Sequence, residues 1–219
     1  LVAGRGAGYI AMHWRGHSAD MQSRAVYGDV VAEVCRELAS RRDAALAAGV
    51  APELLVLDPG LGFAKLPAHN WTLTAYLDRV VALGRPVLYA ASRKGFLGKV
   101  GRGADDAPRP VSDRDVATAA TSVLAAQAGA WAVRVHDVPS TWDALDVWEA
   151  THAARAAGGI GLASVFFLSI GLLTEAFGLG GHRMPAGRQG GDRKIRHRQL
   201  VAFASDRSKI KGGAGGDRN

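Results

Sequence analysis

The sequence predicts an α/β fold in which short parallel strands alternate with amphipathic helices. Four short apolar runs end in polar or charged residues, at 9–15, 54–65, 86–98 and 130–138. A segment with helical spacing of apolar residues follows each run. Consecutive strands that are separated by helices run parallel, so their carboxyl ends lie at the same edge of the sheet. This order predicts about four strand-helix units of a partial TIM (β/α)8 barrel.

The helical segments are expected at 27–48, 70–83, 115–128 and 140–155. The first places Val30, Val34 and Leu38 on one face and charged residues on the other. Gly84 stops the second helix, and Gly129 is the expected C-terminal cap of the third.

The side chains best suited to chemistry gather at the predicted strand ends. They are Met12 with His13, Asp58, Ser92 to Lys94, and Arg134 with His136. Arg134 and His136 alternate along one strand, so both point to the same face, where they can reach an anion. The alternative role of His136 is that of a structural histidine, and the alternative role of Asp58 is to cap its own Asp-Pro-Gly turn.

Residues 158–219 differ from the rest of the chain in composition. The net charge is +7 overall, but residues 182–219 hold ten Lys or Arg against three Asp, and residues 1–181 hold seventeen of each sign. The strand-helix body is thus neutral and has no general nucleic-acid footprint. The uninterrupted apolar stretch 160–173 has 14 residues, fewer than the roughly 20 that cross a bilayer. We expect a disordered or non-native tail, with no nucleic-acid and no membrane partner.

The remaining sequence signals are few. Cys35, the only cysteine, falls on the apolar side of a predicted helix and is expected to pack in the core. The sequence shows no zinc spacing, P-loop or GxGxxG segment, and it assigns no metal ligand. No targeting sequence is recognisable before the first strand, so we expect a cytoplasmic protein.

Four segments resemble the last four strand-end motifs of the dihydropteroate synthases, a pterin-binding barrel family. They are MHWRG at 12–16, LDPGLGFAK at 57–65, ASRKGFLG at 91–98 and VRVHDV at 133–138, in the family's order and at comparable spacing. The resemblance covers about residues 9–150. It implies a transferase of folate biosynthesis that condenses 6-hydroxymethyl-7,8-dihydropterin diphosphate with 4-aminobenzoate, giving 7,8-dihydropteroate and pyrophosphate.

The resemblance gives the strand-end residues specific roles. Asp58 would accept N–H bonds from the pterin edge, and Lys94 would donate to the pterin carbonyl or ring nitrogen. Arg134 and His136 would hold the diphosphate as it leaves, and Arg134 also offers the pterin a planar surface. Lys94, Arg134 and His136 are therefore the expected catalytic residues, and together with Asp58 they are expected to bind substrate.

Three further residues complete the expected binding set. Met12 is expected either to wall the pterin ring or to fill the core. By the resemblance, Phe63 lies on the wall of the 4-aminobenzoate slot, and Lys94 lies beside this substrate. Gly95 stands near its carboxylate, where relatives have Ser or Arg, and it offers only a backbone N–H at a helix start.

The resemblance is confined to the second half of the family's barrel. An eightfold barrel needs about 250 residues, and the family's opening asparagine-containing loop, which helps to hold the diphosphate and Mg²⁺, has no counterpart here. Mg²⁺ is therefore expected only through the resemblance. We expect residues 1–157 to form the C-terminal half of the barrel, the chain alone to be inactive, and the protein to be a homodimer, as is common among relatives.

Three other functions remain open from the sequence. A catalytically silent pterin-binding homologue would bind the pterin diphosphate without releasing pyrophosphate. A methyltetrahydrofolate-type methyltransferase would share the pterin aspartate, but Arg134 and His136 favour an enzyme that has a diphosphate to stabilise. A nucleic-acid protein would use the basic tail at 182–219.

Overall fold

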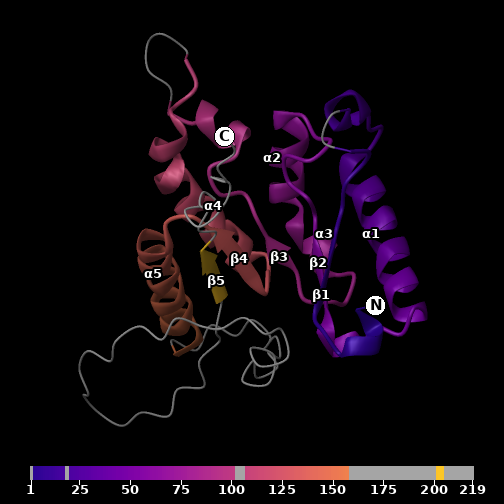
Figure 1. Cartoon of the computed structure of the whole chain (residues 1–219). Helices are drawn as coiled ribbons and strands as arrows, with labels where there is room; N and C mark the ends of the chain where they lie inside the picture. The colour runs from indigo at the N-terminus through magenta and orange to yellow at the C-terminus, as the bar shows by residue number, and fades with distance from the viewer. Residues whose placement is uncertain (1, 18–19, 102–106, 158–200, 205–219) are drawn as a thin grey trace, which may run out of the picture.

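A computed structural model describes residues 2–17, 20–101, 107–157 and 201–204 (Figure 1). The strands and α-helices follow one another along the chain as β1 (Tyr9–Met12), α1 (Val30–Ala47), β2 (Leu55–Asp58), α2 (Pro67–Ala75), α3 (Leu77–Val81), β3 (Leu88–Tyr89), α4 (Asp115–Gln127), β4 (Ala132–Val135), α5 (Val138–Ala157) and β5 (Val201–Ala204). Short 3-10 helices η1 to η5 lie at Ala3–Arg5, Met21–Arg24, Pro52–Leu54, Gly95–Lys99 and Val111–Arg114.

All strand pairs in the described residues are parallel, as the alternation of strands and helices predicts. Strand β1 pairs with β2 from Tyr9 opposite Leu55 to Met12 opposite Asp58. A parallel bridge between Leu57 and Val87 connects β2 to the chain that leads into β3. Strands β3, β4 and β5 then form a second hydrogen-bonded group in that order. The described part of the chain is therefore α/β with neighbouring strands in chain order, and its strands do not close into a barrel.

Strand β5 departs from the prediction that residues 158–219 lack regular structure. Its four residues pair in parallel with β4, from Ala132 opposite Val201 to Val135 opposite Ala204. The unpaired edge of β4 accounts for this, because an open parallel edge offers N–H and C=O groups to any extended segment. The rest of the predicted tail, 158–200 and 205–219, lies outside the described residues, as does the apolar stretch 160–173.

The helices form where the sequence predicts them, with one break. Helix α1 starts at an N-cap, because Asp29 Oδ1 accepts hydrogen bonds from the N–H groups of Val31 and Ala32, both at 3.0 Å. The single helix expected at 70–83 is instead α2 and α3, which meet at Tyr76 with φ −113° and ψ 33°. Thr74 Oγ1 donates to the carbonyl of Asn70 at 2.8 Å, and such back-bonding bends a helix.

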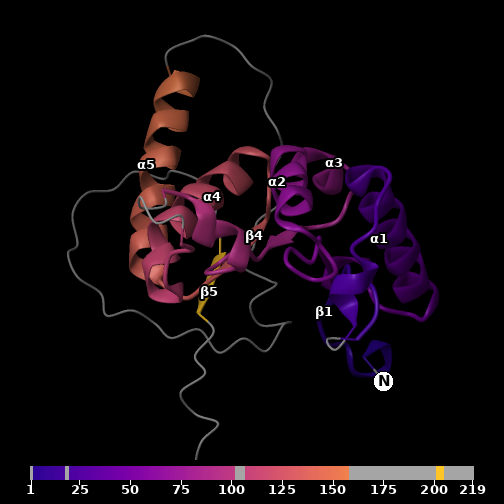
Figure 2. The same cartoon turned by 90° about the horizontal axis from the view of Figure 1, so that it is seen from above.

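The helices lie side by side along the described part of the sheet. In both whole-chain views α1 and α5 stand at opposite ends, with α2 and α4 between them (Figures 1 and 2). None of the described helices is long and apolar enough to span a membrane. This arrangement leaves the carboxyl ends of β1 to β4 at one edge.

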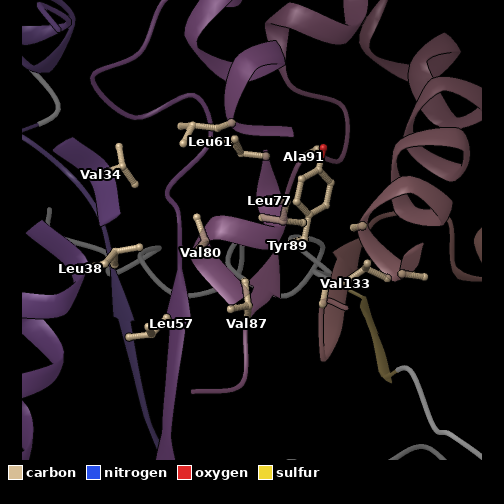
Figure 3. Close-up of a cluster of buried hydrophobic side chains, with 14 of the residues drawn as sticks. Val34, Leu38, Leu57, Leu61, Leu77, Val80, Val87, Tyr89, Ala91 and Val133 are labelled. Carbon is tan, nitrogen blue, oxygen red and sulfur yellow. The ribbon is translucent and has the colours of Figure 1, made fainter. Parts of the chain in front are cut away.

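The core lies between the strands and the helices that cover them. Figure 3 shows Val34 and Leu38 of α1 beside Leu57 of β2, with Val80 of α3 and Val87 nearby. All five are buried members of one apolar cluster, and Leu38 and Leu57 are fully buried. Cys35 packs against this cluster and is half-buried, which agrees with its expected role.

We expect the substitution Leu38→Ala to lower the free energy of unfolding by about 2–5 kcal/mol, because it empties a fully buried site in the core. The matched control is Leu124→Ala on α4, where the side chain is 48% exposed and the loss should stay below about 1 kcal/mol. Urea unfolding of the 219-residue chain measures both. Equal losses at the two positions would contradict this assignment of the core.

Candidate active site at the carboxyl ends of the strands

The ends of β1 and β2 meet directly. Met12 is opposite Asp58 in the register, and the next residue, His13, donates its backbone N–H to the Asp58 carbonyl at 2.8 Å. Asp58 ends β2 with its side chain almost fully buried. The expected convergence of these strand ends is thus present in the structure.

The loop after β2 folds back under tight steric limits. Gly60, Gly62 and Ala64 all have positive φ, at 64°, 78° and 50°. A Cβ on Gly60 would stand 1.8 Å from the carbonyl oxygen of His13, so no side chain fits there. Asp58 Oδ1 accepts the Gly60 N–H at 2.7 Å. Asp58 therefore does cap its own turn, which was the alternative role weighed for it.

Asp58 is also surrounded by positive charge. Burial raises the pKa of its carboxyl group, whereas the Gly60 N–H and the charges of Lys94, Arg134 and Lys65 act in the opposite direction. Lys65 follows Asp58 in the same loop, whereas Lys94 and Arg134 come from the next two strand ends, so the cations converge on one carboxylate. This convergence is the arrangement that the sequence predicts for Asp58, Lys94 and Arg134.

Lys94 reaches across to the β2 loop. Its ammonium donates to the carbonyl of Leu61 and lies 4.8 Å from the centre of the Phe63 ring. Burial lowers the pKa of Lys94 to about 8, with the charge of Asp58 opposing the shift and that of Arg134 adding to it. A lysine in this state can change its charge near neutral pH.

Arg93 fixes the backbone that presents Lys94. It has φ 57°, which is uncommon for a residue with a side chain. Its guanidinium group binds both carboxylate oxygens of Asp115, at 2.8 and 2.6 Å. Its N–H donates to Thr118 Oγ1 at 3.2 Å, and its carbonyl accepts from Arg114 at 3.0 Å. The start of α4 therefore holds Arg93 through both its side chain and its backbone.

Arg134 and His136 lie on the exposed side of the end of β4. Ser92 Oγ accepts the backbone N–H of His136 at 3.1 Å and lies 2.8 Å from its Nδ1. A hydroxyl group can both donate and accept hydrogen bonds, so the donor in the contact between Ser92 Oγ and His136 Nδ1 depends on the tautomer of the ring. The serine of the neighbouring strand end thus fixes the orientation of the His136 ring.

The other three expected site residues differ in how far they are exposed to solvent. Met12 and Phe63 are half-buried, and Gly95 is exposed. Gly95 begins the five-residue 3-10 helix η4, so it lies at a helix start as expected, although the helix is short. A Cβ on Gly95 would meet no atom within 4 Å, so the glycine leaves open space beside Lys94.

Three residues beneath the strand ends have no role in the sequence-based prediction. His13 Nδ1 lies 2.8 Å from Lys65 Nζ, and His13 Nε2 lies 3.0 Å from Glu37 Oε2. All three belong to different segments, so no local pattern marks them as a group. The only feature of the sequence that could have indicated a role for them is that His13 and Lys65 each lie inside a strand-end motif.

The described residues do not offer a ligand set for Mg²⁺. They contain no group of three or more His, Cys, Asp or Glu side chains placed to hold a metal. Asp58, the carboxylate of the site, already faces three cations, which oppose a further positive ion. The geometry instead suits a ligand that combines hydrogen-bond donors with negative charge.

Comparisons with known proteins agree with this geometry. Residues 1–136 match the family described as pterin binding enzyme. The chain is 54% identical over 148 residues to the dihydropteroate synthase of Mycobacterium leprae (strain TN), covering 67% of this chain and 52% of that protein. It is 39% identical over 140 residues to that of Haemophilus influenzae, covering 64% and 49%. The chain thus spans about half the length of the curated relatives it matches.

Solved structures of the same enzyme are similar in fold. Dihydropteroate synthase from Thermus thermophilus in complex with 4-aminobenzoate has a TM-score of 0.63 at 40% identity, covering 69% of this chain and 59% of that one. The same enzyme in complex with 6HMPPP has a TM-score of 0.63 at 39% identity, covering 69% and 58%. With well over half of its residues matched by the family, this chain belongs to the pterin binding enzymes.

Proposed function

We propose that the chain provides the C-terminal strand-helix units of a dihydropteroate synthase barrel. The reaction joins the amine nitrogen of 4-aminobenzoate to the exocyclic methylene carbon of the pterin. The carbon–oxygen bond to the diphosphate breaks, pyrophosphate leaves with the bonding electrons, and the amine loses a proton. The convergence of Lys94 and Arg134 on the buried carboxylate of Asp58 is the observation that carries this proposal.

Asp58 and Lys94 together suit the edge of a pterin. The pterin edge presents adjacent N–H donors and a carbonyl acceptor, and a buried carboxylate next to an ammonium group offers the complementary pair. Both groups are mostly shielded from water, which strengthens their hydrogen bonds to a ligand. Half-buried Met12, which lies opposite Asp58 in the sheet, would contact the ring face.

Arg134 and His136 suit the departing diphosphate. Negative charge grows on the leaving group as the carbon–oxygen bond breaks, and fixed cations and N–H donors near it lower the barrier. Arg134 is exposed at the end of β4, and its charge lowers the pKa of both Asp58 and Lys94. One ligand at this end of the strands would therefore contact all three side chains. A ring N–H of His136 would be its donor to the diphosphate.

The second substrate would lie beside Phe63 and Lys94. The Phe63 ring supports the apolar face of an aminobenzoate, and the ammonium 4.8 Å from the ring centre attracts the carboxylate. Gly95 leaves space there but contributes no side-chain donor. We therefore assign weaker carboxylate binding to this chain than to relatives with Ser or Arg at this position.

Two expectations from the resemblance stay predictions. We assign no step to Mg²⁺, because its ligands would have to come from outside the described residues. The homodimer also stays a prediction, which sedimentation of the 219-residue chain would test.

Calorimetric titration of the 219-residue chain with 6-hydroxymethyl-7,8-dihydropterin diphosphate tests the proposed function. We expect binding in the wild type and about 10- to 100-fold weaker binding in Asp58→Asn, because the amide loses a charge-assisted hydrogen bond to the pterin. The amide oxygen of this variant can still accept the Gly60 N–H, so the turn should persist. The control Asp43→Asn changes a carboxylate that is paired with Arg42 on α1 and should leave the affinity unchanged.

Adding 4-aminobenzoate and the pterin diphosphate to the chain completed with the N-terminal half of a related dihydropteroate synthase barrel separates the two pterin hypotheses. Pyrophosphate release supports the synthase, whereas binding without release supports a catalytically silent pterin-binding homologue. A wild type that binds no pterin diphosphate would contradict both.

We expect Arg134→Gln to weaken binding of the pterin diphosphate about tenfold or more while hardly changing the affinity for 6-hydroxymethyl-7,8-dihydropterin, which has no diphosphate. The reason is that the guanidinium group serves the anion rather than the pterin edge. Arg155→Gln at the exposed end of α5 is the matched control. If both ligands lose affinity equally, Arg134 has no specific diphosphate role, and a methyltransferase becomes the better hypothesis.

The affinity for 6-hydroxymethyl-7,8-dihydropterin should fall as the pH rises through about 8. The pKa of Lys94 in the folded chain is lowered to about 8, so its ammonium form is present below this pH and is lost above it. Loss of the charged donor should weaken binding up to about tenfold. In Lys94→Arg, where the charge persists, the pH profile should be flat. A wild-type profile as flat as that of the arginine variant would exclude this role.

A further inference from the structure

A lysine that the proposed chemistry does not use lies directly under the β2 loop. Lys65 is only 3% exposed. Its Nζ donates to the carbonyl oxygens of Gly60 and Phe63, both at 3.1 Å, and to His13 Nδ1 at 2.8 Å. An ammonium group has three N–H donors, and these three acceptors match them. Lys65 thereby joins both ends of the Gly60–Phe63 turn to the end of β1.

His13 is a fixed partner for this lysine. The ring is fully buried, and Nδ1 accepts from Lys65, so the ring proton lies on Nε2 and is donated to Glu37 at 3.0 Å. Burial, followed by the charge of Lys65, lowers the pKa of His13 to about 3. The neutral ring therefore links the lysine to the carboxylate of Glu37, which Arg15 holds in place through hydrogen bonds.

Charged groups from four other residues act on Lys65. Burial lowers its pKa to about 7, the carboxylates of Asp58 and Glu37 favour the charged form, and Lys94 and Arg15 oppose it. The ammonium is thus held between the site carboxylate on one side and the His13–Glu37 pair on the other. Its position depends on both.

Lys65 is an internal charged donor to the turn above it. Gly60 and Gly62 in this turn have positive φ, and the curled backbone directs the carbonyls of Gly60 and Phe63 inward. The Gly60 carbonyl also accepts the Phe63 N–H at 3.1 Å, so Lys65 adds a second, charged donor there and joins this carbonyl to that of Phe63. Buried carbonyl groups that lose a partner are costly. On the outer side, the Gly62 N–H donates to Asn70 Oδ1 at 2.7 Å, and Leu61 provides the carbonyl that accepts from Lys94. Lys65 therefore sits where it can set the position of the groups that contact the ligand.

We propose that Lys65, held by His13 and Glu37, is a positioning residue that fixes the Gly60–Phe63 turn so that Asp58 and Phe63 face the same ligand. Lys65 acts through the backbone of the turn and does not touch the substrate. The part of this proposal that concerns the ligand rests on the proposed function, whereas the part that concerns the turn stands on the hydrogen bonds of Lys65 alone.

Amide hydrogen exchange on the 219-residue chain tests the turn. In Lys65→Met we expect the amides of residues 60–64 to exchange at least about tenfold faster, because each inward carbonyl loses a charged donor. Amides in α4 should keep their wild-type rates. The matched control Lys99→Met removes an exposed lysine from η4 and should change neither region. Unchanged exchange in the turn would overturn the proposal, and so would equal acceleration in α4, since that would indicate a general structural role.

Calorimetry with the pterin diphosphate adds the functional half of the test. Lys65→Met should bind about tenfold more weakly than wild type, while Lys99→Met should match it. Wild-type affinity in Lys65→Met despite a loosened turn would overturn the positioning role. If the wild type itself binds no pterin diphosphate, the proposed function fails while the exchange result still decides the role of Lys65 in the turn.

Nitrogen NMR of the wild-type histidines provides a measurement that does not depend on the folding of a variant. We expect His13 to be neutral near pH 7, with its proton on Nε2 and the Nδ1 resonance typical of a hydrogen-bond acceptor. An imidazolium ring, or a proton on Nδ1, would contradict the three-acceptor arrangement around Lys65. In Lys65→Met the Nδ1 resonance of His13 should shift, whereas His152 on α5 should not.

Discussion

The burial of one carboxylate is the constraint on which this site depends. Asp58 ends a strand whose four residues are all buried, and a buried carboxylate is unfavourable unless hydrogen bonds and opposite charges compensate for the lost water. The chain provides this compensation from four places: the Gly60 N–H, Lys65 beneath, Lys94 from the next strand end and Arg134 from the one after. Strand ends far apart in sequence must therefore converge if Asp58 is to stay charged.

Lys65 and Lys94 help to hold the strand ends together because each also donates hydrogen bonds to backbone carbonyl groups of the β2 loop. Lys94 donates to the carbonyl of Leu61, and Lys65 donates to those of Gly60 and Phe63. The β2 loop is thus held from two sides, which leaves little freedom for the residues it carries. Such rigidity suits a site that must meet a flat bicyclic ligand in one orientation.

Much of the fold was predictable because local patterns determine it. Strands with apolar runs and helices with apolar stripes were found in the predicted order, and the cap at Asp29 and the turn at Gly129 follow ordinary rules. The break at Tyr76 and the start of only a 3-10 helix at Gly95 were not predicted. Strand β5 was missed as well, although residues 200–204 are all apolar, because its pairing with the edge of β4 joins segments far apart in the sequence.

The sequence by itself determined the strands and helices, their parallel order and which polar side chains stand at the strand ends. The spacing of apolar residues and the residues that form turns are local properties of the chain. Only the tertiary structure decided which of these groups share one site and which act beneath it. His13, Lys65 and Glu37 are separated by many residues, yet they form one hydrogen-bonded chain that runs from buried Lys65 to half-buried Glu37. Burial and partner geometry arise only when separate segments pack together, so they decide whether a lysine faces a ligand or holds a loop.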